Sequence, residues 1–170
     1  DVSSVIGQGT TISIDLKLPC SNDSDAKEAN DVFDRSHVEN KRILVVDDIE
    51  LNRIIIKRPL LASGAIVLEA SAASEAIEKI SALATNAESL DLVITDLNMP
   101  GSSGLDLCRA IRKDNRKVPI IMLSSSGLTE EMKALDVTRM LSKPVKVDRL
   151  KSVVTSCLQD EVGASRSVVK

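Results

Sequence analysis

Three aspartates stand directly after apolar runs, where buried strands would end. Asp47 and Asp48 close the run "RILVVDD", and Asp96 closes "DLVITD". Carboxylates brought together repel each other, because two unit charges 4 Å apart interact by about 4 kcal/mol at an effective dielectric constant near 20. A cation must offset that repulsion, and carboxylate oxygens suit Mg²⁺. We therefore expect a magnesium site that keeps Asp96 ionised as a nucleophile.

Two further polar residues follow later apolar runs. Ser124 ends "VPIIMLS", and Lys143 ends "VTRMLSK". A lysine ammonium group and a serine hydroxyl beside the carboxylates would neutralise the oxygens of an incoming phosphoryl group. Taken singly, an Asp after a strand usually caps a helix or forms a turn. The joint occurrence of these residues at several strand ends favours a site instead.

The elements that must position these residues alternate regularly from residue 41 onward. Strands are expected at 42–48, 65–70, 91–96, 118–124 and 137–143, and helices at 49–64, 71–85, 103–113, 129–135 and 147–159. This alternation predicts an α/β fold: a doubly wound, five-stranded parallel sheet with helices on both faces. Ligands bind such sheets outside the carboxyl ends of the strands. Within the first helix, Pro59 predicts a kink or break near 56–59.

The N-terminal part of the chain has a different composition. Residues 10–18 alternate like a half-buried strand that has no partner of its own. Residues 20–40 hold six acidic residues against two basic ones, which is typical of a linker, with a short helix expected near 26–34. The single histidine, His37, lies in this linker and is expected to be solvated. Residues 161–170 are expected to fray.

Composition excludes several function classes. The net charge is −3 and Phe33 is the only aromatic residue. Binding to nucleic acid is therefore not expected, because it relies on clustered cations and aromatic stacking. The three cysteines show no paired or metal-type spacing, which indicates reduced thiols in a cytosolic protein. No apolar run approaches the length of a membrane span, so no insertion of this segment into a membrane is expected.

The motifs "ILVVDD", "DLVITDLNMPGSSGLDL", "VPIIMLSS" and "LSKPV" together resemble the receiver domain of two-component response regulators. The resemblance covers roughly residues 41–160. It implies a flavodoxin-like receiver fold with strand order 2-1-3-4-5. It also implies that Asp96 accepts a phosphoryl group, and that Mg²⁺ is held by Asp47, Asp48, Asp96 and the backbone carbonyl of Asn98.

The resemblance assigns the remaining site residues as well. It implies that Lys143 pairs with the phosphoryl group, that Ser124 moves to hydrogen-bond it, and that Pro144 follows a cis peptide bond. The loop after Asp96 would be shaped by Met99, Pro100 and Gly101, together with Gly104. Two features depart from the family pattern: Met140 stands where an aromatic switch residue is usual, and the interval from Ser124 to Lys143 is about one helical turn short, which predicts a stubby or disordered fourth helix.

The N-terminal stretch "IGQGTTISIDLKLP" looks like the last strand of a histidine-kinase ATP-binding domain, and "VDDIELNR" is typical of receivers fused to kinases. The chain is therefore interpreted as the C-terminal receiver of a hybrid histidine kinase: 1–19 a remnant of the ATP-binding domain, 20–40 an acidic linker, 41–160 the receiver and 161–170 a flexible tail. The implied partners are a histidine kinase dimerisation domain, a histidine phosphotransfer protein, or both.

The same interpretation limits what the chain does by itself. It lacks the phosphorylatable histidine and nucleotide-binding boxes of a kinase, so it is expected only to catalyse its own phosphoryl acceptance and loss. A cytoplasmic location is implied, compatible with a membrane anchor elsewhere in the parent kinase. Two alternatives remain. One is a receiver used only for docking, without phosphorylation. The other is a phosphohydrolase with an aspartyl nucleophile, against which Asn98 stands where an acidic proton donor is usual.

Overall fold

The computed structural model describes residues 1–17, 35–114, 117–125, 127 and 129–165, with the backbone alone for Arg35 and 160–165. The chain divides into two compact units, residues 1–30 and 31–170, and each is described by itself. No helix in the described ranges is long and apolar enough to cross a membrane.

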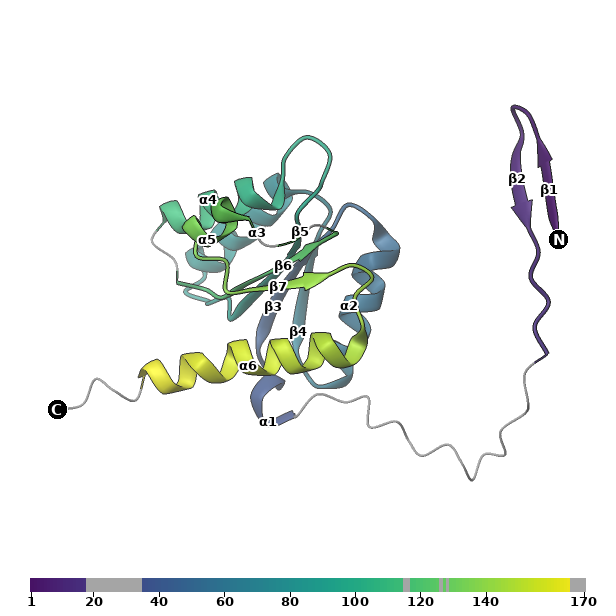
Figure 1. Ribbon diagram of the computed structural model, residues 1–170. Coiled ribbons are helices and arrows are strands. Elements are labelled where there is room, and N and C mark those ends of the chain that lie inside the picture. The colour runs from purple at the N-terminus through teal and green to yellow at the C-terminus, as the bar shows by residue number, and fades with distance from the viewer. Residues whose placement is uncertain (18–34, 115–116, 126, 128, 166–170) are drawn as a thin grey trace, which may run out of the picture. The chain divides into compact units, whose positions relative to one another are not determined.

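The larger unit is built on a five-stranded parallel sheet (Figure 1). Its strands are β3 (Arg42–Val46), β4 (Ile66–Ala70), β5 (Leu92–Asp96), β6 (Ile120–Ser124) and β7 (Arg139–Ser142). They pair in the order β4-β3-β5-β6-β7, and every pairing is parallel. The predicted doubly wound α/β fold and its strand order 2-1-3-4-5 are confirmed. Because the central strands are buried on both faces, their sequences are continuous apolar runs rather than alternating ones.

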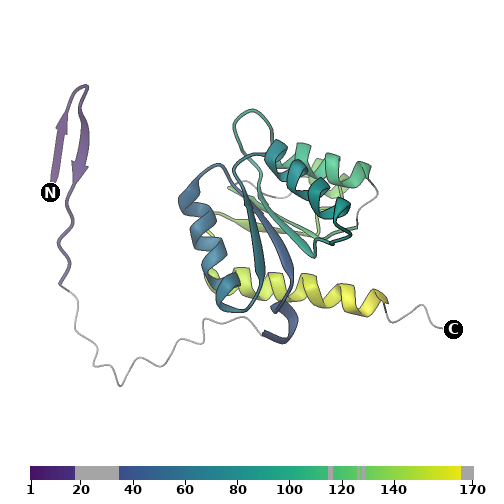
Figure 2. The ribbon, with the colours of Figure 1, turned by 180° about the vertical axis from the view of Figure 1, so that it is seen from behind.

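Helices cover the two faces of the sheet (Figures 1 and 2). One face carries α1 (Arg35–Val38), α2 (Glu50–Ala62) and α6 (Val147–Ser165), and the other carries α3 (Ala73–Thr85), α4 (Gly104–Lys113) and α5 (Glu130–Ala134). Each face has its own core of buried aliphatic side chains, as the nearly complete lack of aromatic residues requires. The short α5 agrees with the stubby fourth helix expected from the sequence.

Helix α2 continues through Pro59, so the chain does not break near 56–59, and a kink there stays a prediction. Ile56 and Leu60 are both buried against the sheet, on either side of the proline. Their packing holds the helix together where proline removes one backbone hydrogen bond, because tertiary burial outweighs local propensity. The Ser63 hydroxyl donates a hydrogen bond to the Pro59 carbonyl oxygen at 3.0 Å, close to the end of the helix.

The smaller unit differs from the single strand expected at 10–18. Strand β1 (Val2–Val5) pairs antiparallel with β2 (Gly9–Ile12) as a hairpin. Residues 13–17 are not strand, and Leu18 lies outside the described residues. Gly7 and Gly9 adopt φ angles of +79° and +107°, a conformation that glycine reaches without strain and that lets the chain reverse. Strand β1, four residues long, is the partner that the sequence does not predict.

The segment before β3 contributes to the core of the larger unit. Val38 lies within the expected linker at 20–40, but its side chain is fully buried in the core beside α6. His37 is half-buried rather than solvated, and its Nε2 lies 3.2 Å from the Gln159 side-chain nitrogen. The helix expected near 26–34 lies outside the described residues. At the other end of the chain, α6 continues to Ser165, beyond the predicted end at residue 159.

Replacing Val38 with Ala tests this packing. We expect the free energy of unfolding to fall by about 2 kcal/mol, because two buried methyl groups are removed and a cavity remains. Urea titration followed by circular dichroism measures the change. Leu61→Ala, at a residue 46% exposed near the end of α2, is the control and should cost far less. Equal losses in both variants would show that Val38 is not part of the core.

Candidate functional site

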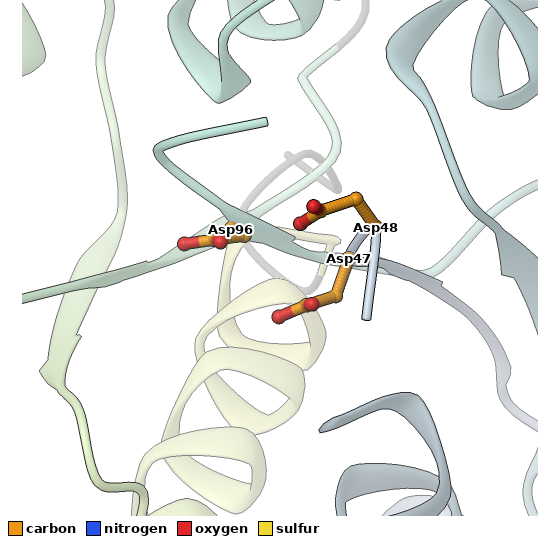
Figure 3. A group of neighbouring side chains, drawn as sticks. All are labelled: Asp47, Asp48 and Asp96. Carbon is orange, nitrogen blue, oxygen red and sulfur yellow. The ribbon is translucent and has the colours of Figure 1, made fainter. Parts of the chain in front are cut away.

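The three aspartates converge at one rim of the sheet. Asp47 and Asp48 directly follow β3, and Asp96 is the last residue of the neighbouring strand β5. Their carboxylate oxygens lie within 4.8 Å of one another, and Figure 3 shows the three groups directed to the same side. Asp47 and Asp96 are buried, whereas Asp48 is exposed. The pocket of negative charge therefore opens to solvent on the side of Asp48.

Lys143 supplies the positive charge that this cluster needs. Its Nζ lies 2.7 Å from an Asp96 oxygen and 3.1 Å from an Asp47 oxygen. Burial lowers the pKa of Lys143, but the hydrogen bonds and charges of Asp96 and Asp47 outweigh burial, so the net pKa is raised above 10.5. The ammonium group therefore stays charged at neutral pH. Lys143 and Pro144 are joined by a cis peptide bond, as expected.

The loop after Asp96 is held by a close backbone contact. A Cβ at Gly104 would lie 2.2 Å from the Asp96 carbonyl oxygen, so only glycine fits there. The Gly104 amide also donates a hydrogen bond to the Leu97 carbonyl oxygen at 2.9 Å. Helix α4 thus begins directly against the backbone of Asp96. Ser103 and Asp106 form a capping box that fixes this start of the helix.

The other loop residues named from the sequence lie between Asp96 and α4. Asn98 and Pro100 are exposed, whereas the Met99 side chain is buried in the core on the α3–α4 face. Gly101 has a φ angle of +81°, which favours glycine in the turn. Asn98 is therefore exposed two positions after Asp96, while the buried Met99 side chain anchors the loop.

Ser124 and Met140 occupy the far side of the site from β3. Ser124 ends β6, the strand that pairs with β5, and is completely buried. Met140 lies one strand further out in β7, half-buried and packed against the core shared with α4 and α5. The sheet thus brings five predicted site residues, Asp47, Asp48, Asp96, Ser124 and Lys143, to one rim. Met140 stands apart from them, among core side chains.

Two site residues received no role from the sequence. Asn52 donates from its amide nitrogen to both carboxylate oxygens of Asp47, at 3.0 and 3.1 Å. Arg53 donates to the Asp47 backbone carbonyl oxygen at 2.6 Å. Both belong to the motif "VDDIELNR", which indicated the kind of protein but not these contacts. Their spacing after Asp47 places them on the first turn of α2, facing back toward the strand end.

The residues present fit a divalent cation. Three carboxylates offer hard oxygen ligands, and one of them is open to solvent. Among the described residues, Lys143 is the only cationic side chain that pairs with their carboxylate oxygens. One ammonium group leaves most of the negative charge uncompensated. A hard divalent cation at the open side would offset the remainder.

The close contact at Gly104 makes a specific prediction. Gly104→Ala should lower the free energy of unfolding by about 3 kcal/mol, because the added methyl group must displace the backbone of Asp96. Gly127→Ala is the matched control, since a Cβ there meets no atom within 4 Å. Chemical denaturation of both variants measures the difference. A Gly104 variant as stable as the Gly127 variant would contradict the contact.

Comparison with known proteins agrees with this geometry. The family model described as "Response regulator receiver domain" matches residues 43–155. Sensor protein EvgS of Escherichia coli (strain K12) is 32% identical over 149 residues, which are 86% of this chain and 12% of EvgS. Chemotaxis protein CheY1 of Helicobacter pylori (strain J99 / ATCC 700824) is 46% identical over 89 residues, covering 51% of this chain and 68% of CheY1.

Among solved structures, the receiver domain from hybrid histidine kinase CckA is 31% identical, with a TM-score of 0.58, and covers 69% of this chain and 99% of that one. The chain spans only 12% of the length of EvgS, so activities of the whole relative do not transfer directly. The matched segment contains every strand end that forms the acidic site. The chain belongs to the response regulator receiver domain family.

Proposed function

We propose that this chain is the phosphoacceptor receiver of a hybrid sensor histidine kinase, and that Asp96 accepts the phosphoryl group. The observation that carries the proposal is the contact of Lys143 Nζ with Asp96 at 2.7 Å, inside a cluster of three carboxylates. The positive charge of Lys143 lies directly against the Asp96 carboxylate and offsets part of the charge of the acidic cluster. An ionised carboxylate at the solvent-facing rim is a competent nucleophile.

In the proposed step, an Asp96 oxygen forms a bond to phosphorus while the bond from phosphorus to the donor's histidine nitrogen breaks. The nitrogen keeps the electron pair, and the product is an acyl phosphate. Bound Mg²⁺, held by Asp47, Asp48, Asp96 and the carbonyl of Asn98, would supply positive charge to the phosphoryl oxygens. Lys143 offers a second positive charge on the other side of Asp96. Ser124 would donate a hydrogen bond once it turns toward the phosphoryl group.

Phosphorylation changes the charge at this rim by about −1.5 to −2 near pH 7. The loop of Met99, Pro100 and Gly101 follows Asp96 directly, and Lys143, which precedes Pro144, contacts Asp96. Met140 lies three residues before Lys143 on β7 and packs in the adjoining core. A signal results only if one conformer of these segments binds the phosphorylated group better than another does. The output is either transfer onward to a histidine of a second protein or control of the attached kinase.

The N-terminal unit supports the assignment to a hybrid kinase. The EvgS match covers 149 residues, 86% of the chain, and therefore extends beyond the segment 43–155 that the family model matches. The hairpin β1–β2 exposes Val2 by 66% and Ile12 by 64%, and a lone two-stranded sheet is only marginally stable. We infer that residues 1–19 end the kinase ATP-binding domain and that the acidic segment 20–40 links it to the receiver. The receiver core includes Val38 from the end of that segment, and the last receiver helix continues to Ser165.

The implied partner is a histidine-bearing helical domain, from the parent kinase or from a phosphotransfer protein. A cleft of about 450 Å³ adjoins the acidic cluster and is lined by Asn52, Ile55, Lys143 and Val145, among others. Leu51 and Ile55 on α2 are 63% and 44% exposed. An apolar helix face docked here would bring a histidine to Asp96 and cover these side chains. The cytoplasmic location stays a prediction.

The alternatives from the sequence fit the geometry less well. A receiver used only for docking would not need a buried Asp96 in contact with Lys143. A phosphohydrolase needs an acid or base two residues after its nucleophile, and the amide of Asn98 cannot transfer a proton. The phosphoacceptor role uses all the polar groups at the rim.

Phosphorylation can be tested directly with a small donor. The full chain is incubated with acetyl phosphate and Mg²⁺, and its intact mass is measured. We expect wild type to gain the mass of one phosphoryl group and Asp96→Asn to gain none. Asp136→Asn is the matched control. Asp136 is exposed and has a φ angle of +54°, which Asn also tolerates, so this variant should gain the phosphoryl group as wild type does.

Chelation of Mg²⁺ should abolish the gain in wild type. A gain that persists in Asp96→Asn would place the phosphoryl group elsewhere. No gain in wild type, with the fold intact by circular dichroism, would refute the phosphoacceptor role and favour a docking module. Continuous release of phosphate with a phosphomonoester substrate would favour the phosphohydrolase.

A further inference from the structure

Asp47 is the most completely held of the three carboxylates. Its Oδ1 accepts hydrogen bonds from the Ile49 amide at 2.9 Å and from the Asn52 side chain at 3.0 Å. Its Oδ2 accepts from Asn52 at 3.1 Å and from Lys143 Nζ at 3.1 Å. The residue has no exposed surface. Asn52 is therefore the single side chain that contacts both oxygens of this buried carboxylate among the described residues.

Asp48 presents the opposite case. It is exposed, and its carboxylate makes no hydrogen bond or ion pair with any described residue. Asp96 is buried and contacts Lys143. The three carboxylates thus differ in how many of their oxygen lone pairs remain available to a cation. Asp48 offers its oxygens freely, whereas those of Asp47 already accept four hydrogen bonds from three groups.

Asn52 is itself held in place. It lies on the first turn of α2, and its backbone N–H donates a hydrogen bond to the Ile49 carbonyl oxygen at 3.1 Å. The next residue, Arg53, donates to the Asp47 carbonyl oxygen, and its Nε lies 3.6 Å from a Glu69 oxygen on β4. Glu69 also pairs with Lys57, one turn further along α2. This network ties the first turns of α2 to two strands, so Asn52 cannot move independently of the strand ends.

The bidentate contact restricts rotation of the Asp47 carboxylate. Without it, Lys143 would attract one oxygen and the Ile49 amide the other, and neither contact fixes the plane of the group. The negative charge of Asp47 would then take several positions relative to Asp48 and Asp96. Removing a group that orients the ligands of a bound metal typically lowers metal affinity or activity 10–100-fold.

We propose that Asn52 is a positioning residue of the cation site: it fixes the Asp47 carboxylate, so that Asp47, Asp48 and Asp96 meet the cation in one arrangement. The proposal rests on the phosphoacceptor function described above. It assigns to Asn52 no contact with the phosphoryl group. Asn52 acts through Asp47 alone.

Mg²⁺ titration of the full chain tests the proposal. Two variants remove the amide: Asn52→Ala by truncation and Asn52→Leu at similar volume. Asn52→Gln keeps an amide on a longer side chain. Nuclear magnetic resonance of backbone amides in the site follows Mg²⁺ binding, and the unfolding midpoint is measured separately without Mg²⁺. Leu61→Ala, on the same helix but at its far end, is the control.

We expect the Kd for Mg²⁺ to rise about tenfold or more in the Ala and Leu variants. Asn52→Gln should recover part of the affinity, and Leu61→Ala should match wild type. The temperature of measurement lies well below the unfolding midpoint of every variant compared. If one variant does not fold, the other amide-free variant decides.

A Kd within twofold of wild type in a folded amide-free variant would overturn the proposal. That result, accompanied by a lower unfolding midpoint, would mean that Asn52 only satisfies a buried carboxylate. Acetyl phosphate labelling of wild type distinguishes failure of the positioning role from failure of the proposed phosphoacceptor function. Labelled wild type with unchanged variant affinities refutes the positioning role alone, whereas wild type that neither binds Mg²⁺ nor becomes labelled refutes the proposed function together with it.

Discussion

The repulsion among three carboxylates at one rim of the sheet is the constraint that shapes this molecule. Asp47, Asp48 and Asp96 place like charges within 4.8 Å, and folding must hold them there. Lys143 meets two of them from the end of the fifth strand in the sheet order, which requires β7 to lie beside β6 and β6 beside β5. The site therefore forms only when the whole sheet forms, because the offsetting charge of Lys143 lies 96 residues after Asp47 in the chain.

Rigid contacts to the backbone hold the three carboxylates in place against their repulsion. Each carboxylate belongs to, or directly follows, a strand buried on both faces, so the repulsion acts on atoms that cannot move apart without opening the core. Gly104 presses the start of α4 against the Asp96 carbonyl oxygen. Asn52 and Arg53 hold Asp47 from the side of α2. Both helices that flank the acidic rim are thus fastened to the backbone or side chain of a carboxylate residue.

Burial of aliphatic side chains explains two places where the structure differs from local expectation. Pro59 should interrupt α2, but Ile56 and Leu60 bury on one face and keep the helix whole. Val38 lies in a segment whose acidic composition indicates a linker, yet the side chain completes the core beneath α6. In both cases the burial of a few aliphatic atoms outweighs a local signal, since propensity and composition do not include distant contacts.

The sequence by itself determined the alternation of strands and helices, the parallel sheet and its order by resemblance, and the gathering of Asp47, Asp48, Asp96, Ser124 and Lys143 at the carboxyl ends of strands. The alternation and the strand-end residues follow from periodicity and from the residues that close each apolar run, which are local properties of the chain, whereas the strand order followed only from the resemblance. Only the tertiary structure decided that Asn52 would bind both oxygens of Asp47, that Gly104 alone would fit against Asp96, and that a short β1 would pair with β2. Those contacts depend on how closely particular backbone and side-chain atoms approach in the folded chain, which periodicity and residue type do not define.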